Sequence, residues 1–370
     1  MVINMFNNIY KNKRVLITGH TGFKGSWLST WLLKLGAEVI GVSNEIPTSP
    51  SLFETLGLAE KITDYRCDIR DLINFKLIIE KEKPDFIFHL AAQPIVSISY
   101  HDPLNTISSN VIGTANLLEI MKEAAFECVM ILITSDKAYD NVEQVWGYKE
   151  NDSLGGKDVY SGSKGAAELI IKSYFNSFYK NSNNRVRLGV GRAGNVIGGG
   201  DWARDRIVVD CMQSWSGKKR VEIRSPNSTR PWQHVLEPLS GYLSLGVHIY
   251  NNPSDSGECF NFGPRAEQNR TAVELLTDLS VYWEFNNKEE AYASTDYIPF
   301  NESSLLKLNC DKALSVLNWQ SCLSYDETVR FTSLWYFSYY NKSHDMYNYT
   351  LEQLNEFENL AFKQNLKWTI

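Results

Sequence analysis

The sequence lacks the short spacings that mark zinc sites and redox-active thiol pairs. Its six cysteines form no C-x-x-C pair, and its six histidines form no H-x-x-x-H pattern, although metal ligands are usually supplied at such spacings. A chain of 370 residues buries about three-quarters of its unfolded surface, so it needs no disulfide or metal for stability. We therefore predict free thiols and no metal site.

An excess of positive charge and long apolar runs are missing as well. The 43 Asp and Glu outnumber the 37 Lys and Arg, for a net charge of −6, which argues against a nucleic-acid partner. The most apolar stretches, such as Val129–Ile133, are far shorter than the ~20 residues that a membrane span requires. The segment Met1–Lys13 has no apolar core of a signal peptide. We expect a cytoplasmic protein with neither nucleic acid nor membrane as a partner.

What the sequence does contain is an alternation of short apolar strands with helices. The expected strands are 14–18, 38–42, 85–90, 128–134 and 186–192, and the expected helices are 27–35, 72–82, 110–125 and 163–179. Helices between continuous apolar strands are typical of a parallel sheet that is covered on both faces. We predict an α/β fold with a Rossmann-like, doubly wound parallel sheet, whose ligands bind at the carboxyl ends of the strands.

The alternation loosens after Gly194, where segments are shorter and punctuated by glycine and proline. We expect a sheet domain of residues 1–194 and about 236–262, a smaller α/β substrate-binding lobe of about 195–235 and 264–325, and a helical tail of 326–370. In the sheet domain, 259–262 is a candidate edge strand. The predicted tail helices, 328–340 and 351–367, either cover the core or bind a partner.

A glycine-rich loop joins the first strand to the first helix. Its glycines, Gly19, Gly22 and Gly25, have the spacing G-x-x-G-x-x-G. The first permits a tight turn, the second lets a pyrophosphate approach the backbone, and the third allows close packing of helix on strand. The N–H groups at the helix N-terminus then face the phosphates. This placement favours a dinucleotide-binding loop over a purely structural turn.

The end of the second strand, which often distinguishes NAD from NADP enzymes, does not decide between the two cofactors here. The second strand ends at Ser43 and Asn44, so it offers neither the carboxylate that binds ribose hydroxyls nor an arginine for a 2′-phosphate. Asp68, after the next expected strand, is a candidate adenine contact, and a structural turn is the alternative.

Tyr160 and Lys164 form a Y-x-x-x-K pair at the start of an expected helix. The i, i+4 spacing places phenol and ammonium on one face. A free phenol has a pKa near 10, so we expect the ammonium to favour the phenolate and enable Tyr160 to remove a proton from an alcohol. Ser135, which ends the preceding apolar strand, would hydrogen-bond that alcohol and the phenol.

These features resemble the extended short-chain dehydrogenase/reductase superfamily, in its sugar-nucleotide branch. Five further stretches narrow the resemblance to the CDP-glucose 4,6-dehydratase family, in collinear order from about Lys13 to at least Trp335. The stretches are His89–Pro94, Asn110–Thr114, Thr134–Asn141, Arg192–Trp202 and Arg230–Pro238.

The resemblance implies a lyase that uses NAD in an internal redox cycle on CDP-D-glucose. In that family hydride leaves C4 as a tyrosine, here Tyr160, removes the hydroxyl proton; water is lost across C5–C6, and hydride returns to C6. The product is CDP-4-dehydro-6-deoxy-D-glucose. Asp136 would be the acid for the C6 hydroxyl, and Lys137 would be either the base at C5 or a cation beside the enolate.

Two alternatives stay open. One is a 4,6-dehydratase, 4-epimerase or reductase that acts on another nucleotide sugar, and the other is a dinucleotide sensor without activity. An epimerase has no use for the pair Asp136 and Lys137, and a sensor would be expected to lack Tyr160 or Lys164.

The resemblance also assigns the remaining site residues. Besides Tyr160 and Lys164, the expected NAD ligands are Gly19, Thr21, Gly22, Phe23, Gly25, Asp68, Ile69, Leu90, Ala91, Ala92, Asn110 and Thr134. The expected substrate ligands are Gln93, Tyr100, Asn195, Trp202, Arg206, Arg230 and His234. The two arginines match diphosphate oxygens best, whereas Trp202 could equally be a core residue.

Some positions depart from the family pattern. Ser97 stands where arginine is usual, Ala138 where cysteine is usual, Val209 where proline is usual, and 157–159 reads Lys-Asp-Val instead of Tyr-Asp-Pro. These departures leave room for a different nucleotide or hexose. Apolar faces on 110–125 and 163–179 fit a homodimer or a dimer of dimers, or they simply cover the sheet.

Overall fold

The computed structural model describes residues 4–181, 185–223, 226, 228–265, 268–283, 285, 288–294 and 305–370. Its centre is a seven-stranded sheet in the order β11-β6-β5-β4-β1-β2-β3, with every neighbouring pair parallel. The strands are β1 Arg14–Thr18, β2 Glu38–Ser43, β3 Thr63–Arg66, β4 Phe86–His89, β5 Cys128–Ile133, β6 Val186–Ala193 and β11 Cys259–Phe262. The predicted doubly wound parallel sheet is confirmed, with β11 at one edge.

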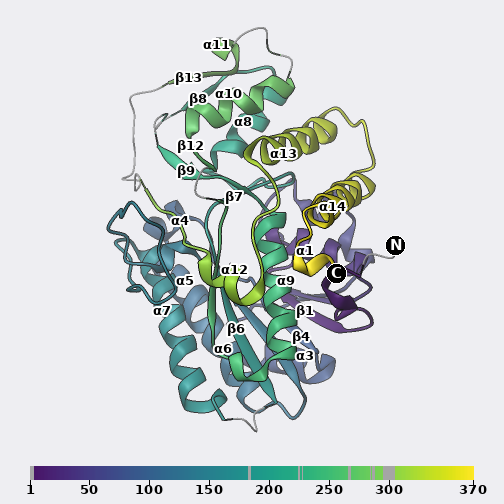
Figure 1. Cartoon of the computed structure of the whole chain (residues 1–370), viewed down its shortest axis with the longest axis vertical. Coiled ribbons are helices and arrows are strands. Elements are labelled where there is room, and N and C mark those ends of the chain that lie inside the picture. Colours follow the sequence, from purple (N-terminus) through teal and green to yellow (C-terminus); the bar gives the residue numbers. More distant parts are fainter. Residues whose placement is uncertain are drawn as a thin grey trace.

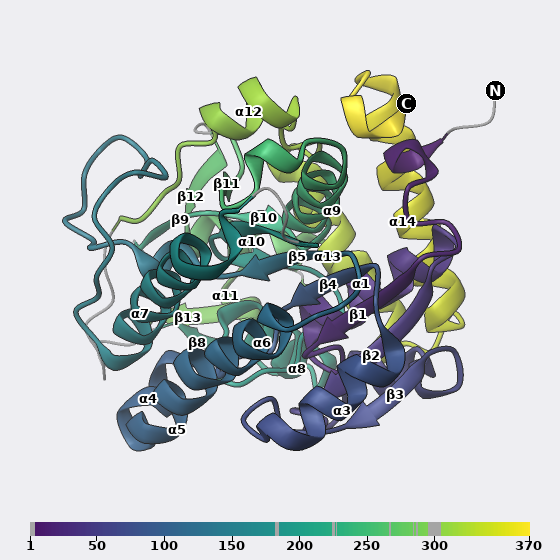
Figure 2. The same cartoon turned by 90° about the horizontal axis from the view of Figure 1, so that it is seen from below.

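Helices cover both faces of this sheet (Figure 2). One face carries α3 Leu72–Glu82, α6 Gly113–Lys122 and α7 Val159–Tyr174, and the other carries α1 Phe23–Lys34 and α9 Leu236–Asn251. Alternate residues of a strand enter opposite cores: in β1, Leu16 packs with the α3/α6/α7 side, whereas Val15 and Ile17 pack with α1 and α9. Burial on both faces explains why the strand sequences are continuously apolar.

The helix predicted over 110–125 begins earlier, ends earlier at Lys122 and is less regular than expected. It is approached by α5 Pro103–Ile107 and a π-helical turn, η3 Ser108–Ile112, before α6. Pro103 opens α5 after the N-cap Asp102, whose carboxylate accepts from the Asn105 amide. The proline marks a helix start there, as the first helical turn tolerates its missing N–H.

Above the sheet in Figure 1 lies a group of shorter elements. They are α8 Ile207–Ser216, α10 Ala272–Ser280, α11 Lys288–Ala291 and the strand pairs β8 Val221–Ile223 with β13 Tyr292–Ser294, β9 Thr229–Pro231 with β12 Asn269–Thr271, and β7 Val196–Ile197 with β10 Gln233–His234. Parts of the ranges expected for the smaller lobe, 224–225, 227, 266–267, 284, 286–287 and 295–304, lie outside the described residues. The domain division therefore stays a prediction.

The remaining short elements connect the larger ones. They are η1 Met5–Asn8, α2 Leu52–Thr55, η2 Leu58–Glu60, α4 Val96–His101, η4 Asp136–Ala138, η5 Phe175–Tyr179, η6 Pro253–Asp255, η8 Val281–Trp283 and α12 Asp311–Leu317. In the part of the chain that the structure describes, no helix combines the length and apolarity needed to cross a bilayer.

The C-terminal helices pack against the N-terminal part of the chain (Figure 1). They are α13 Tyr325–Tyr340, α14 Met346–Lys363 and the final turn η9 Lys367–Thr369. Trp31 of α1 lies edge-on to Phe357 of α14 and to Trp368 of η9, and Phe6 stacks on Trp368. The Trp31 indole also donates to Glu358 at 2.8 Å. The helix that begins at the glycine-rich loop is thus anchored by the end of the chain.

We expect Trp31→Ala to lower the free energy of unfolding by about 3–5 kcal/mol, because it removes a fully buried indole and leaves a cavity. The matched control is Trp146→Ala, since that side chain is 67% exposed and its loss should change stability by less than about 0.5 kcal/mol. Urea unfolding of both variants measures the difference. Equal losses in the two variants would contradict this packing.

Candidate active site

A cavity of about 1540 Å³ opens at the carboxyl ends of the parallel strands. It is lined by residues that follow β1, β3, β4, β5 and β6 and by the group of shorter elements above them. Every site residue predicted from the sequence lines it except Asn110 and His234. Single small-molecule pockets are typically ~300–1,000 Å³, so this cavity has room for two ligands side by side.

The glycine-rich loop forms one wall of the cavity. Gly19 has φ +75, and a Cβ there would lie 2.8 Å from the Ala91 nitrogen, so only glycine fits. A Cβ on Gly25 would lie 2.2 Å from the Gly19 carbonyl oxygen, which is the close helix–strand contact expected. Gly22 is the N-cap of α1, and no described side chain caps it. The first N–H groups of α1 therefore fit the pyrophosphate of a dinucleotide.

Sequence reasoning missed His20, which lies inside the glycine loop. Its ring is fully buried and hydrogen-bonds with Ser43 Oγ at 3.0 Å and Asp64 Oδ1 at 2.9 Å. Burial lowers the pKa of His20. The histidine fixes the Ser43 hydroxyl at the end of β2, where the sequence offers no carboxylate. A histidine directly after the conformationally required Gly19 was the available signal.

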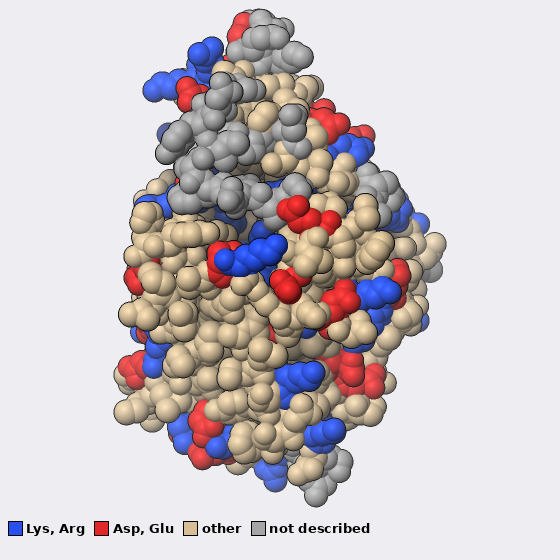
Figure 3. Space-filling view, turned by 90° about the vertical axis from the view of Figure 1, so that its left-hand side faces the viewer, with Lys and Arg blue, Asp and Glu red and all other residues tan. Residues whose placement is uncertain are grey.

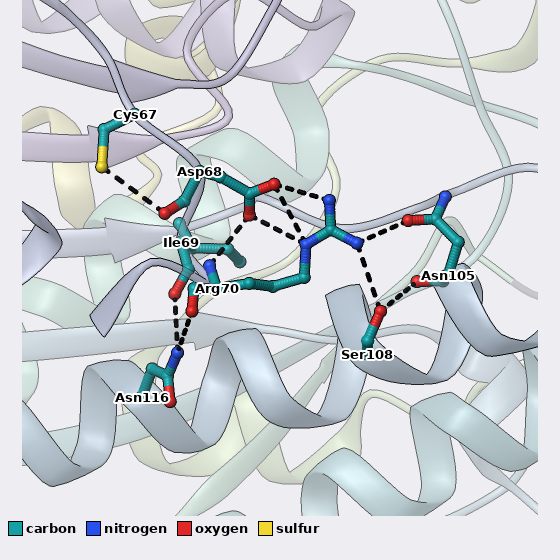
Figure 4. A network of polar contacts seen from close by, with 7 residues as sticks. All are labelled: Cys67, Asp68, Ile69, Arg70, Asn105, Ser108 and Asn116. Carbon is teal, nitrogen blue, oxygen red and sulfur yellow. Dashed lines mark hydrogen bonds and ion pairs between the residues drawn. The ribbon is translucent and has the colours of Figure 1, made fainter. Parts of the chain in front are cut away.

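Asp68 belongs to a polar network between β3, α5 and α6 (Figure 4). Its carboxylate accepts from the Arg70 amide at 2.8 Å and from the Arg70 guanidinium, a contact that lowers the pKa of Asp68. The same guanidinium donates to Asn105 Oδ1 at 2.6 Å and Ser108 Oγ at 3.2 Å. Asn116 donates to the carbonyls of Ile69 and Arg70. The carboxylate thus has a structural role, and the chain at Asp68 still lines the cavity.

Two short elements bring the predicted catalytic residues together. Ser135 caps the single turn η4, accepts from the Lys137 amide at 3.2 Å and donates to Asp136 Oδ1 at 2.9 Å. Asp158 caps α7 by accepting from Ser161, which places Tyr160 in the first turn. Ser135 also hydrogen-bonds with the Tyr160 phenol. Serine, acid and phenol therefore meet at the end of β5.

Burial controls the protonation of these groups. It raises the pKa of Asp136, against smaller opposing effects of Lys137 and Ser135, so this carboxyl can hold a proton where an ordinary one would not. Burial lowers the pKa of Lys164 to about 8, against the charge of Glu168 one turn further along α7. Near-neutral pKa values suit proton transfer.

The pKa of the Tyr160 phenol is raised and not lowered as we expected. Burial raises the pKa of Tyr160 to about 12, and the charge of Asp136 adds to this rise. The largest contributions that lower it come from Ser135 and Arg206, whereas we expected Lys164 in this role. Lys164 is a fully desolvated ammonium whose main charged partner is Glu168.

Lys24 is a second residue that sequence reasoning missed. It precedes Gly25 in the glycine loop, is half-buried and lines the cavity. Burial and the nearby charge of Arg206 lower the pKa of Lys24 to about 8, whereas Asp136 raises it. The charge of Lys24 in the glycine loop therefore acts on Asp136, the predicted acid. Lys24 could have been found from the sequence as a lysine within a loop of the phosphate-binding type.

On the substrate side, Arg206 pairs with the carboxylate of Asp201 and lines the cavity with Arg230 of β9. Asn195, Gln93 and the exposed Tyr100 line it too. Trp202 is only 6% exposed. Its indole packs on residues of α13 and donates to a tyrosine of that helix at 3.2 Å, so most of its surface belongs to the core.

Two predicted ligands lie elsewhere. Asn110 is buried behind the cavity wall, where its side chain accepts from the Gln93 amide at 2.8 Å and donates to Ser163 Oγ at 2.9 Å. His234 is fully buried between Trp27 and Phe331, and burial lowers its pKa to about 3. Neither side chain lines the cavity, and their contact with a ligand stays a prediction.

We expect Lys137→Met to raise the pKa of Asp136 further, because it removes the strongest charge that favours the carboxylate. Lys157→Met is the matched control, since this exposed lysine borders the same cavity. Carboxyl titration by NMR with isotope-labelled aspartate, assigned with Asp136→Asn, measures both. A wild-type Asp136 that titrates at its ordinary value, or a fall in Lys137→Met, would contradict the geometry.

Comparison with known proteins identifies the family of the chain. The family model described as GDP-mannose 4,6 dehydratase matches residues 16–332. CDP-glucose 4,6-dehydratase from Salmonella typhimurium is 45% identical over 326 residues, covering 87% of this chain and 90% of that protein.

Solved structures share the fold. An epimerase from Methanothermobacter thermautotrophicus has a TM-score of 0.76 at 23% identity, over 91% of this chain and 96% of its own. A dTDP-glucose 4,6-dehydratase from Bacillus anthracis, solved with NAD, has a TM-score of 0.72 at 19% identity, over 88% and 97%. The resemblance read from the motifs is confirmed: the chain belongs to the sugar-nucleotide dehydratase family of the GDP-mannose 4,6 dehydratase model and is similar to CDP-glucose 4,6-dehydratase.

Proposed function

We propose that the protein is an NAD-dependent CDP-glucose 4,6-dehydratase, which converts CDP-D-glucose to CDP-4-dehydro-6-deoxy-D-glucose. The single observation that carries this proposal is the meeting of Ser135, Asp136 and Tyr160 in one cavity behind the glycine loop. The 45% identity to the Salmonella protein of that name supports the choice of nucleotide.

The glycine loop and the uncapped start of α1 would hold NAD, which when bound accepts hydride from the sugar and later returns it. Tyr160 takes the proton of the C4 hydroxyl. Because burial raises its pKa to about 12, the phenolate depends on the hydrogen bond from Ser135 and the positive charge of Arg206.

Asp136 gives a proton to the departing C6 hydroxyl. Its raised pKa keeps the carboxyl protonated to higher pH than usual, so water loss should decline as the pH rises through that value. Lys137, next to it on η4, acts at C5 either as the base while neutral or as the cation beside the enolate. The proposal needs no second carboxylate as the base at C5, because Lys137 acts at that carbon.

The substrate's charged half faces two guanidinium groups. Arg206 and Arg230 line the cavity and suit the diphosphate, since a planar guanidinium contacts phosphate oxygens bidentately. Asn195 can donate to the same oxygens. Gln93 and Tyr100, after β4, would flank the hexose.

We expect the purified protein to turn over CDP-glucose in preference to dTDP-, UDP- and GDP-glucose, with a 4-keto-6-deoxy product detected by its absorbance in alkali. Tyr160→Phe should abolish oxidation at C4. Asp136→Asn should slow water loss by about 10²–10⁴ while leaving C4 oxidation measurable as reduced nicotinamide in a single turnover. Asp140→Asn, an exposed carboxyl outside the cavity lining, is the control and should behave as wild type.

Turnover of another nucleotide sugar alone would reassign the substrate. A product that is epimerised at C4 instead of dehydrated would contradict the dehydratase proposal. Full activity of both Tyr160→Phe and Asp136→Asn would contradict it as well. The cytoplasmic location stays a prediction.

We further propose a homodimer through α5, η3, α6 and α7. Figure 3 shows the side of the molecule that carries α4, α5 and α7, with a broad area free of Lys, Arg, Asp and Glu. Large apolar side chains are exposed on these helices, namely Leu104, Ile107, Ile112 and Leu169. Exposed apolar patches of this kind mark protein interfaces.

We expect Leu104→Asp combined with Leu169→Asp to halve the molecular mass in solution, because each places a charge in the proposed interface. Light scattering after size exclusion measures the mass. Leu77→Asp is the control, as this side chain is 59% exposed on α3. A wild-type monomer, or an unchanged mass of the double variant, would contradict the dimer.

A further inference from the structure

The C-terminal helix α13 contributes one residue to the wall of the cavity. Tyr336 lines the cavity although its side chain has no exposed surface overall. The match to the family model ends at residue 332, so this tyrosine lies beyond the matched residues. Its position suggests a contribution to the site that the motifs do not report.

The backbone amide and the backbone carbonyl of Asp201 both hydrogen-bond with the Tyr336 phenol. The Tyr336 hydroxyl donates to the Asp201 carbonyl oxygen at 2.5 Å and accepts from the Asp201 amide at 3.0 Å. Asp201 is buried, and an unpaired buried amide or carbonyl is costly. The hydroxyl therefore determines where this backbone segment lies.

The segment that Tyr336 holds is rich in glycine and has little regular structure. Gly200 has φ +84, and a Cβ on Gly199 would lie 2.0 Å from the Trp335 ring. The Gly199 carbonyl accepts from the Trp27 indole at 2.9 Å. The turn is thus shaped from outside by α13 and α1.

The segment in turn holds the guanidinium of the substrate side. The Asp201 carboxylate accepts from the Ala203 amide at 3.1 Å and pairs with Arg206. Arg206 lines the cavity and lowers the pKa of Tyr160. A continuous set of contacts therefore runs from Tyr336 through Asp201 to Arg206, whose charge acts on the phenol of Tyr160.

We propose that Tyr336 is a positioning residue for the substrate diphosphate: its hydroxyl fixes the Asp201 backbone, and the Asp201 carboxylate then holds Arg206 in the orientation that meets the phosphates. This inference rests on the proposed function for the identity of the nucleotide. What the inference adds to the proposed function is that Tyr336 positions the Arg206 guanidinium for the diphosphate.

The central variant is Tyr336→Phe, which keeps the ring and removes the hydroxyl. We expect the KM for CDP-glucose and the Kd for CDP, measured by calorimetry, to rise about 5- to 10-fold, with kcat within about twofold. A merely structural role would lower the active fraction and kcat and would leave KM and Kd unchanged.

Tyr339→Phe is the matched control on the same helix. Its ring packs on Trp202, and its hydroxyl bonds to Thr55 rather than to the Asp201 backbone. We expect KM and Kd of this variant to equal those of the wild type. Equal effects of the two tyrosine variants would overturn the proposal.

A double-mutant cycle with Arg206→Gln tests the route of the effect. If Tyr336 acts through Arg206, the loss in CDP affinity caused by Tyr336→Phe should vanish when Arg206 is already replaced. Additive losses would show that the tyrosine acts elsewhere and would overturn the proposal.

Hydrogen exchange of the wild-type protein gives a test without any variant. The Asp201 amide should exchange much more slowly than the amide of exposed Arg204, and equally fast exchange would contradict the contact. Failure of the proposed function is distinguishable, because CDP-glucose would then not be turned over by the wild type. The role of Tyr336 would still be decided by hydrogen exchange at the Asp201 amide. The double-mutant cycle with Arg206→Gln, repeated with inorganic pyrophosphate as the probe, would decide it too.

Discussion

Removal of water from charged groups at the end of β5 is the constraint on which the site depends. Asp136 and Lys164 are both buried, and burial moves their pKa values in opposite directions, upward for the carboxyl and to about 8 for the ammonium. Desolvation disfavours the charged form of each group, so both come closer to neutrality than they would in water. A site that takes one proton and gives another requires groups of this kind.

Such a cluster is stable only if the backbone behind it cannot relax. Glu168 and Arg192 form a buried bidentate ion pair, with Arg192 Nε 2.8 and 2.9 Å from the two carboxylate oxygens. Thr134, next to Ser135, donates to Glu168 at 2.5 Å, and Arg192 donates to Tyr139 at 2.6 Å. The pair therefore joins β5, β6, α7 and the loop after η4, although a buried ion pair by itself adds little to stability.

Sequence reasoning reached the elements whose signals are local. The glycine spacing depends on contacts within a few residues, as between Gly19 and Gly25, and the alternation of strands and helices follows from burial on both sheet faces. It did not reach side chains whose direction is set by distant packing. His234 points between α1 and α13, and nothing in its neighbourhood along the chain indicates this. Tyr336 reaches Asp201 across 135 positions, which no local spacing encodes.

One departure from the family pattern lies at the rim of the cavity. Ser97, where arginine is usual, donates its hydroxyl to Asp205 at 2.6 Å, and both residues line the cavity. A guanidinium at position 97 would be attracted by that carboxylate and would add positive charge beside the phosphates. With serine, the link across the rim is a single hydrogen bond, and in the proposed function the diphosphate is left to Arg206 and Arg230. The orientation of Arg206 therefore matters more in this chain than it would beside a third cation.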